Sequence, residues 1–446
     1  MSRKEVLREF ESQRAWMDAR VNAGIERFRK GDLTLKFYDR KMQPAENVQV
    51  QAVQIDHDFN FGANLFMLDE FNTPEMNAHY RAQFKALFNA ATLPFYWSDL
   101  EPEAGKPRFT KDSPKVYRRP APDLCLEYCE ANGIRPKAHC LNYDVWTPLW
   151  VPQEVNAVKR ALDKRMAELA ARYRDRIYGW EVTNELLCGH YSRLHENRTA
   201  TPFFWERDNM EWSFETARRH FPMNELIVNE AANIWEGFHG DRSPYYMELE
   251  RALLKGAPID TIGFQCHMFG ARENEDRYVA NRYNPQFVCS VLDRYGDFGK
   301  PMQITEVTVP SYSADPEDEA IQAELARQLY RLWFSSQYME SIIYWNTIDG
   351  YAAFAKQGDM TRGENTLYGG LMRFDGSRKP IFDTLHDLIH KEWHTEAHAE
   401  TTDGTVTMRA FYGTYRLTVT ANGRTGTQTV HFGKDSGAIR VVLDLG

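Results

Sequence analysis

Residues 177–185 read Ile-Tyr-Gly-Trp-Glu-Val-Thr-Asn-Glu, a short apolar run that ends in an Asn-Glu pair. The run predicts a buried strand that presents Asn184 and Glu185 at its carboxyl end. A second run, Met302-Gln-Ile-Thr-Glu306, ends in a glutamate in the same way. In a barrel of alternating strands and helices, the carboxyl ends of the strands form one face. We therefore expect Glu185 and Glu306 to lie on the same face of the fold.

Two carboxylates placed in this way suit the cleavage of a glycosidic bond. One carboxyl group donates a proton to the leaving oxygen, and the other attacks the sugar as a nucleophile. Either glutamate alone could be an ordinary loop residue that follows a strand. Together they favour an enzyme.

Strand-like and helix-like segments alternate from about residue 59 onward. Helical periodicity is clearest at 154–174, 316–338 and 380–391. We expect strands at 59–66, 91–97, 134–141, 177–184, 225–230, 260–267, 301–306 and 341–346. This alternation predicts an α/β fold, a (β/α)8 TIM barrel. A doubly wound open sheet is the alternative, but no glycine-rich phosphate turn follows the first predicted strand.

Both ends of the chain show a different pattern. Residues 1–29 have helical spacing, and alternation between 31 and 58 predicts two strands. Four Thr-rich strands separated by turns are expected between 401 and 445. Because each set alone would leave strand edges unpaired, we expect 1–58 and 396–446 to build one small β-sandwich domain beside a catalytic barrel at 59–395. Such a domain could bind sugar or simply hold the barrel's termini.

The composition narrows the choice of partners. The net charge of −9, with no basic tract to offset it, argues against nucleic acid or an anionic membrane as a partner. The chain contains 11 Trp, 22 Tyr and 26 Phe, whose rings can cover the flat C–H faces of sugars. This richness permits a carbohydrate partner without requiring one.

The six cysteines show no metal-ligand spacing, so we expect six buried thiols in a reducing compartment, with no metal and no cofactor. The N-terminus lacks the apolar segment of a secretory signal. A cytoplasmic location is expected for the sequence as written, and a secreted or periplasmic one if a leader was removed.

Three motifs carry a family resemblance: Trp180-Glu-Val-Thr-Asn-Glu185, Gln303-Ile-Thr-Glu306 and Ile259-Asp-Thr-Ile-Gly-Phe-Gln-Cys-His267. Together they resemble the acid/base, nucleophile and sixth-strand motifs of glycoside hydrolase family 10, the retaining β-1,4-xylanases. The resemblance runs from about 60 to 392. It implies a double-displacement hydrolase of xylan or xylo-oligosaccharides, with Glu185 as acid/base and Glu306 as nucleophile.

The resemblance also implies roles for three neighbouring residues. His267, with Gln265 on the same face of its strand, is expected to donate a hydrogen bond that keeps Glu306 ionised. Asn184 is expected to bond the 2-hydroxyl of the reacting sugar, a contact that strengthens in the transition state. Glu185 needs a raised pKa, which a second carboxylate nearby favours.

Departures from the family pattern gather on the glycone side. The second strand reads Thr92-Leu-Pro-Phe-Tyr96 where the family has Glu-Asn-x-x-Lys, so Leu93 and Tyr96 are expected to wall off that side. Asn346 and Phe354 replace a Gly and a Trp. Exo action, or a different sugar, follows as a hypothesis.

The third strand is altered in its motif as well. Tyr143 stands where the family has Trp, and Asp144 stands where it has His. We expect both residues to bind substrate, together with His139 on the same strand and Trp345 on the eighth.

Three alternatives stay open. The protein could be a non-catalytic carbohydrate-binding barrel, although such a protein has no use for paired carboxylates. It could be a glycosidase for a different β-linked sugar. It could also be a metal-dependent hydrolase with His139, His267 and Asp144 as ligands. Activity that survives EDTA would dismiss this last alternative.

Overall fold

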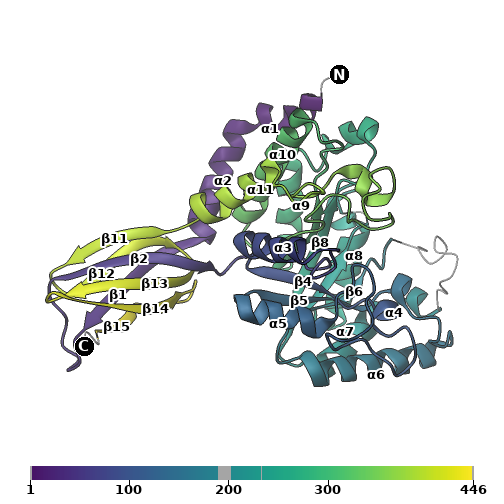
Figure 1. Ribbon diagram of the computed structural model, residues 1–446, viewed down its shortest axis with the longest axis horizontal. Helices are drawn as coiled ribbons and strands as arrows, with labels where there is room; N and C mark the ends of the chain where they lie inside the picture. Colours follow the sequence, from purple (N-terminus) through teal and green to yellow (C-terminus); the bar gives the residue numbers. More distant parts are fainter. Residues whose placement is uncertain (1–2, 189–201, 233, 444–446) are drawn as a thin grey trace.

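The computed structural model describes residues 3–188, 202–232 and 234–443. Within these ranges the chain forms two lobes, a large one of strands and helices and a small one made of sheets alone (Figure 1). The N-terminus lies on the large lobe, and residues 30–57 join the last strands of the chain in the small lobe, at the left of the view.

Eight parallel strands close into a barrel, in the order β10-β3-β4-β5-β6-β7-β8-β9. The strands are β3 (Asn60–Asn64), β4 (Ala90–Pro94), β5 (Arg135–Asn142), β6 (Gly179–Asn184), β7 (Glu225–Glu230), β8 (Thr261–His267), β9 (Met302–Thr308) and β10 (Met339–Tyr344). They lie within a few residues of the eight expected strands. The predicted (β/α)8 barrel is therefore confirmed, and the open-sheet alternative is wrong.

Helices surround the barrel and connect its strands (Figure 1). They are α3 (Pro74–Leu87), α4 (Trp97–Leu100), α5 (Pro122–Asn132), α6 (Val155–Tyr173), α7 (Asn209–His220), α8 (Pro244–Leu254), α9 (Pro285–Gly296), α10 (Pro316–Ser335) and α11 (Pro380–Asp387). Six of them begin with proline, whose fixed φ suits the first helical position. Side chains of Thr73, Asn284 and Asp315 accept backbone N–H groups at the starts of α3, α9 and α10.

The small lobe consists of two sheets in the orders β12-β1-β15 and β11-β2-β13-β14. Its strands are β1 (Lys30–Tyr38), β2 (Val48–His57), β11 (Glu396–Thr401), β12 (Thr405–Phe411), β13 (Gly413–Ala421), β14 (Arg424–Phe432) and β15 (Ile439–Val442). Strands from the two chain ends pair with one another, as expected. We did not predict β11, because its Glu-Ala-His-Ala-Glu-Thr sequence has low β propensity and lies at a sheet edge.

The small lobe has an apolar core of its own, which includes Leu33, Val50 and Leu417. The N-terminal segment consists of α1 (Arg8–Ser12) and α2 (Arg14–Phe28) and leads into this lobe along the barrel. Helix α2 lies directly on α10. A Cβ at Gly24 would stand 2.3 Å from the carbonyl oxygen of Ser335, so only glycine permits this approach.

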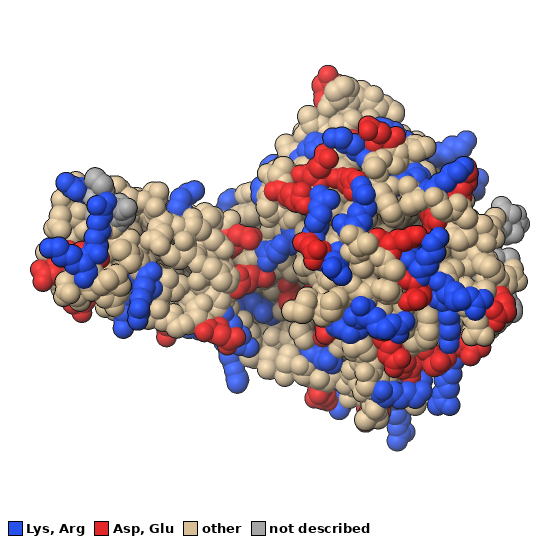
Figure 2. Space-filling view, turned by 90° about the horizontal axis from the view of Figure 1, so that it is seen from below, with Lys and Arg blue, Asp and Glu red and all other residues tan. Residues whose placement is uncertain are grey.

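Acidic and basic side chains are interspersed over the large lobe on the face shown in Figure 2. Among the described residues, no helix combines the length and the apolar character needed to cross a bilayer. Five of the six cysteines are buried thiols, as expected. The exception is Cys188, which is only half-buried because it lies in the loop after β6, where its thiol donates to Glu230 (3.3 Å).

Candidate active site

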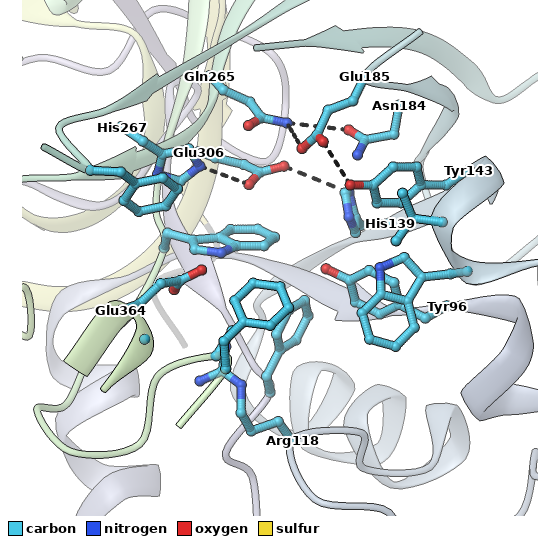
Figure 3. Close-up of a pocket in the computed structure, with 18 of the residues that line it drawn as sticks. Tyr96, Arg118, His139, Tyr143, Asn184, Glu185, Gln265, His267, Glu306 and Glu364 are labelled. Carbon is cyan, nitrogen blue, oxygen red and sulfur yellow. Dashed lines mark hydrogen bonds and ion pairs between the residues drawn. The ribbon is translucent and has the colours of Figure 1, made fainter. Parts of the chain in front are cut away.

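Glu185 and Glu306 line one pocket, of about 360 Å³, at the carboxyl ends of the barrel strands. Glu185 is the first residue after β6, and Glu306 lies in the last part of β9. The two side chains point into the same space in Figure 3. The expected gathering of both carboxylates on one face of the barrel is therefore present.

Glu306 is held by donors from two neighbouring strands. The amide of Asn229, at the end of β7, donates to Oε1 (2.9 Å), and Nε2 of His267 lies 3.0 Å from Oε2. The expected contact between His267 and Glu306 is thus confirmed. Thr308 lies 3.0 Å from Nδ1 of the same imidazole. Burial lowers the pKa of His267 to about 4, so the ring is neutral and donates to Glu306 when Thr308 donates to Nδ1.

Glu185 is oriented by different partners. The hydroxyl of Tyr143 donates to Oε2 (2.6 Å), and the amide of Gln265 donates to Oε1 (3.0 Å). The backbone of Glu185 has φ +56°, a conformation that is costly for a residue with a side chain. Its N–H donates to the carbonyl of Asn229 (3.0 Å), which helps to hold the strained residue in place.

Asn184 is buried beside both carboxylates. Its Oδ1 accepts from Asn229 (2.7 Å) and Gln265 (3.3 Å). Its Nδ2, in contrast, is buried with no hydrogen-bond partner among the described residues. A buried donor in this state is costly unless a ligand satisfies it, which makes Asn184 suited to bind a sugar hydroxyl.

A layer of buried charge lies beneath the two carboxylates. Glu181 on β6 accepts hydrogen bonds from Lys137 and His139 on β5. Burial would raise the pKa of Glu181, but Lys137 and His139 outweigh this and lower it to about 2. Burial opposes charge on His139, yet Glu181 raises the pKa of His139 above its ordinary value. Glu181 thus favours the cationic form of the imidazole, whose Nδ1 lies 3.9 Å from Oε1 of Glu306.

The proton balance of Glu306 differs from expectation. Burial raises the pKa of Glu306 well above its ordinary value, and Glu181 and Glu185 add to the effect. His139 and Asn229 act in the opposite direction. The pocket therefore raises the pKa of Glu306 where the sequence predicted an ionised group, and His139 is the neighbour that acts most strongly against this rise.

The ligand trio of the metal-dependent alternative is not brought together. His139 and His267 line the pocket, but Asp144 lines a neighbouring hollow with Leu187 and Trp205. Glu185 lines that hollow as well as the pocket, so the hollow adjoins the site and the expected substrate contact of Asp144 stays a prediction.

A different group, His139, Glu181 and Glu306, could offer ligand atoms within 4.8 Å of one another. The ammonium of Lys137 already neutralises Glu181 within that group, which disfavours a second cation.

The end of the pocket where the resemblance predicts the glycone side is aromatic and carries an arginine. The guanidinium carbon of Arg119 lies 3.9 Å from the ring centre of Tyr96 and 4.7 Å from that of Trp146. Arg119 also pairs with Asp99 (2.9 Å). Leu93, expected at this wall, is instead fully buried in the barrel core, because consecutive strand residues face opposite sides.

Trp345 completes the pocket, as expected. It is 6% exposed, and its ring centre lies 5.2 Å from that of Phe66 and 5.5 Å from that of His139. Phe269 is 45% exposed and stacks on His267, with ring centres 4.1 Å apart, and the ring centre of Trp345 lies 6.1 Å from that of the same imidazole. Aromatic rings thus line the pocket beside Glu306.

Several functional candidates escaped the sequence analysis. Asn229 follows the apolar residues Leu226 to Val228 and precedes Glu230, so it repeats the strand-plus-Asn-Glu signal of Asn184 and Glu185. That repetition could have identified it. Other missed residues come from loops without a recognisable pattern or from strand interiors: Arg118, Arg119, Glu364, Lys137 and Glu181.

A closed (β/α)8 barrel with two carboxylates at strand ends and aromatic walls places the protein among the glycoside hydrolases. The comparison with known families sharpens this class. The model of glycosyl hydrolase family 10 matches residues 59–380, so the chain belongs to this family. The expected family resemblance is therefore confirmed.

The curated relatives are longer and distant. The anti-sigma-I factor RsgI6 of Acetivibrio thermocellus is 25% identical over 432 residues, which are 95% of this chain and 49% of that protein. Endo-1,4-beta-xylanase 2 of Arabidopsis thaliana is 24% identical over 79% of this chain and 29% of its own length. The chain thus spans about half the length, or less, of these relatives.

Solved structures agree on the fold. Native xylanase 10B from Thermotoga maritima superposes with a TM-score of 0.58 at 19% identity, over 75% of this chain and 96% of that one. A family 10 structure from Paenibacillus barcinonensis gives a TM-score of 0.57 at 19% identity, over 75% and 95%. At this identity the likeness concerns the barrel alone.

Proposed function

We propose that the protein is a retaining glycoside hydrolase that cleaves β-glycosidic bonds of xylan-type substrates or xylo-oligosaccharides. Glu185 serves as acid/base and Glu306 as nucleophile. The observation that carries the proposal is the shared pocket of these two carboxylates, each held by its own set of donors. Family membership and the relatives named as xylanases support the substrate class.

The reaction begins with a proton on Glu185. Tyr143 and Gln265 hold the Glu185 carboxyl group at the leaving oxygen, to which it donates that proton. The ionised Glu306 then attacks the anomeric carbon and forms a covalent glycosyl-enzyme. Asn229 and His267 donate to the ionised form of Glu306, and His139 stabilises it when the imidazole is protonated.

Water completes the cycle. Glu185, now ionised, takes a proton from a water molecule that attacks the anomeric carbon and breaks its bond to Glu306, so the carboxylate of Glu306 is released and the product retains the β configuration. The unsatisfied amide of Asn184 donates to a hydroxyl of the reacting sugar, and this bond strengthens as positive charge develops on the ring.

We further propose exo action. Arg119, Tyr96 and Trp146 fill the glycone end, which leaves little room for a long chain on that side. Hydrolysis of xylohexaose tests the proposal. Release of xylose alone supports exo action, and mixed oligomers indicate endo action. Absence of products points to a different sugar.

A matched experiment tests the chemistry itself. Turnover of 4-nitrophenyl β-xyloside should give β-xylose as the first product, observed by NMR before mutarotation. Binding without turnover, unchanged in Glu306→Ala, would instead identify a carbohydrate-binding barrel.

We also propose the domain division 1–58 and 396–446 for the β-sandwich and 59–395 for the barrel. The separate apolar core of the small lobe supports this division, as does the family match, which ends at residue 380. Both a sugar-binding and a purely structural role fit the sandwich.

A further inference from the structure

The pocket carries an arginine and a glutamate that the proposed chemistry does not use. Arg118 and Glu364 lie opposite Glu185 and Gln265 in Figure 3. Arg118 donates from Nη2 to Oδ1 of Asn346 (3.1 Å), and Asn346 donates from Nδ2 to Oε2 of Glu364 (2.7 Å). Asn346 therefore bridges a cation and an anion that face the same cavity.

Arg118 is buried with much of its hydrogen-bonding capacity still open. It is 6% exposed, and its recorded bonds go to Asn346 and to the carbonyl of Tyr351. Arg108 and Arg165, also buried and without an ion pair among the described residues, each donate to three backbone carbonyls. A guanidinium has five N–H donors, so Arg118 retains donors that a ligand in the cavity can use.

Glu364 is held in place by its loop. Its N–H donates to the carbonyl of Ala353 (3.1 Å). The preceding Gly363 has φ +52°, and a Cβ there would stand 2.5 Å from the same carbonyl oxygen. In the described part of the chain, only Oε2 of Glu364 accepts a hydrogen bond. Its Oε1 therefore remains as an acceptor at the cavity.

We propose that Arg118 and Glu364 form a clamp for two hydroxyl groups of an uncharged sugar at the non-reducing end. Arg118 donates to one hydroxyl oxygen, and Glu364 accepts from a neighbouring hydroxyl. This inference rests on the proposed function and extends it by naming the residues that select the terminal sugar. Asn346, which departs from the family pattern, has the role of fixing the spacing of the two charges.

The surroundings of Arg118 favour a neutral sugar over an acidic one. Asn346 links Arg118 to Glu364, so the carboxylate of Glu364 lies close to any group that Arg118 binds in the pocket. Of the two arginines, Arg119 is already paired with Asp99. A sugar carboxylate bound to Arg118 would lie beside Glu364, and like charges at short range repel. A hydroxyl pair, by contrast, satisfies both the donor and the acceptor.

Ligand-observed NMR titrations with xylose, glucose and glucuronate test the clamp without requiring turnover. The proteins are wild type, Arg118→Gln, Glu364→Gln and the control Arg362→Gln, an exposed residue of the same loop. We expect each clamp variant to weaken the binding of xylose and glucose about tenfold, because one charge-assisted hydrogen bond is lost. The control should bind like wild type. Wild type should prefer glucose to glucuronate, and Glu364→Gln should reduce that preference.

Unchanged sugar affinity in both folded variants, or tighter binding of glucuronate than of glucose by wild type, overturns the clamp. If Arg118→Gln fails to fold in circular dichroism, the half-buried Glu364→Gln decides alone. Sugar binding that depends on both residues, without hydrolysis of any aryl β-glycoside, leaves the clamp intact and refutes the proposed function. Hydrolysis with sugar binding that neither variant alters refutes the clamp and leaves the proposed function.

Discussion

The two ends of the pocket are built from different parts of the chain. At the end that holds Glu185 and Glu306, the side chains come from strand ends: Asn229, Gln265, His267 and Glu306 all lie in barrel strands. At the glycone end, Arg118, Arg119 and Glu364 come from segments between strands. Strand ends share one rigid frame, whereas loops can be exchanged without disturbing that frame. The sequence motifs around Glu185 and Glu306 are accordingly close to the family pattern, whereas the residues at the glycone end depart from it.

The strongest test concerns the strand-end carboxylates. Glu306→Ala should reduce kcat/KM on 4-nitrophenyl β-xyloside about 10⁴-fold, because the covalent intermediate cannot form. Glu185→Ala should lose less on this substrate, since nitrophenolate leaves without a proton. Azide distinguishes the two variants: it should yield β-xylosyl azide with Glu185→Ala and the α-anomer with Glu306→Ala. Equal, small losses in both variants would mean that neither carboxylate carries the reaction. The end that holds them would then not differ in function from the glycone end.

The second test concerns the charged layer beneath the strand ends. Glu181→Ala should lower the free energy of unfolding by about 3–5 kcal/mol, because it leaves the buried Lys137 without its ion-pair partner. Urea denaturation measures this change. The double variant Glu181→Ala, Lys137→Met should recover part of the loss. A Glu181→Ala variant that is as stable as wild type would show that the strand ends do not depend on this ion pair.

The third test concerns Glu230, which links a strand end to the loop after Glu185. It accepts N–H groups of Leu187 (2.8 Å) and Ala231 (2.7 Å), and burial raises its pKa to about 7. Between pH 4.5 and about 7, the folded protein therefore keeps Glu230 protonated, whereas the unfolded chain has already released this proton. Stability should fall by about 3 kcal/mol as pH rises through this window to 7.

Glu230→Gln should remove that slope, as denaturation between pH 4.5 and 8 would reveal. The same fall in stability in wild type and variant would assign the slope to another group.

The smallest effect is expected at the glycone end. Arg119→Met removes the stacking on Tyr96 and the ion pair with Asp99, together worth about 1 kcal/mol. We expect KM for xylo-oligosaccharides to change severalfold while kcat stays within twofold. A large loss of kcat in Arg119→Met would mean that the glycone end takes part in the chemical step, and the contrast between the two ends would fail.

Much of the barrel could be predicted because its signals are local. Buried parallel strands read as continuous apolar runs, and Pro and Gly mark where helices start and strands turn. The polar edge strand β11 escaped because nothing in Glu396 to Thr401 distinguishes it from a loop until it pairs with β2. The site was predictable where a residue ended an apolar run, as Glu185, His267 and Glu306 do.

The sequence by itself determined a barrel with a β-sandwich from both chain ends, and it determined the two glutamates and their Asn, Gln and His neighbours. Tertiary structure alone decided that Asp144 lines a hollow beside the pocket, that Leu93 enters the core, and that Asn229 and His139 lie around Glu306. Only the tertiary structure brought Arg118 and Glu364 to the same side chain, that of Asn346. The reason is physical: periodicity records which side of an element is buried, whereas proximity between distant loops depends on how the whole barrel closes.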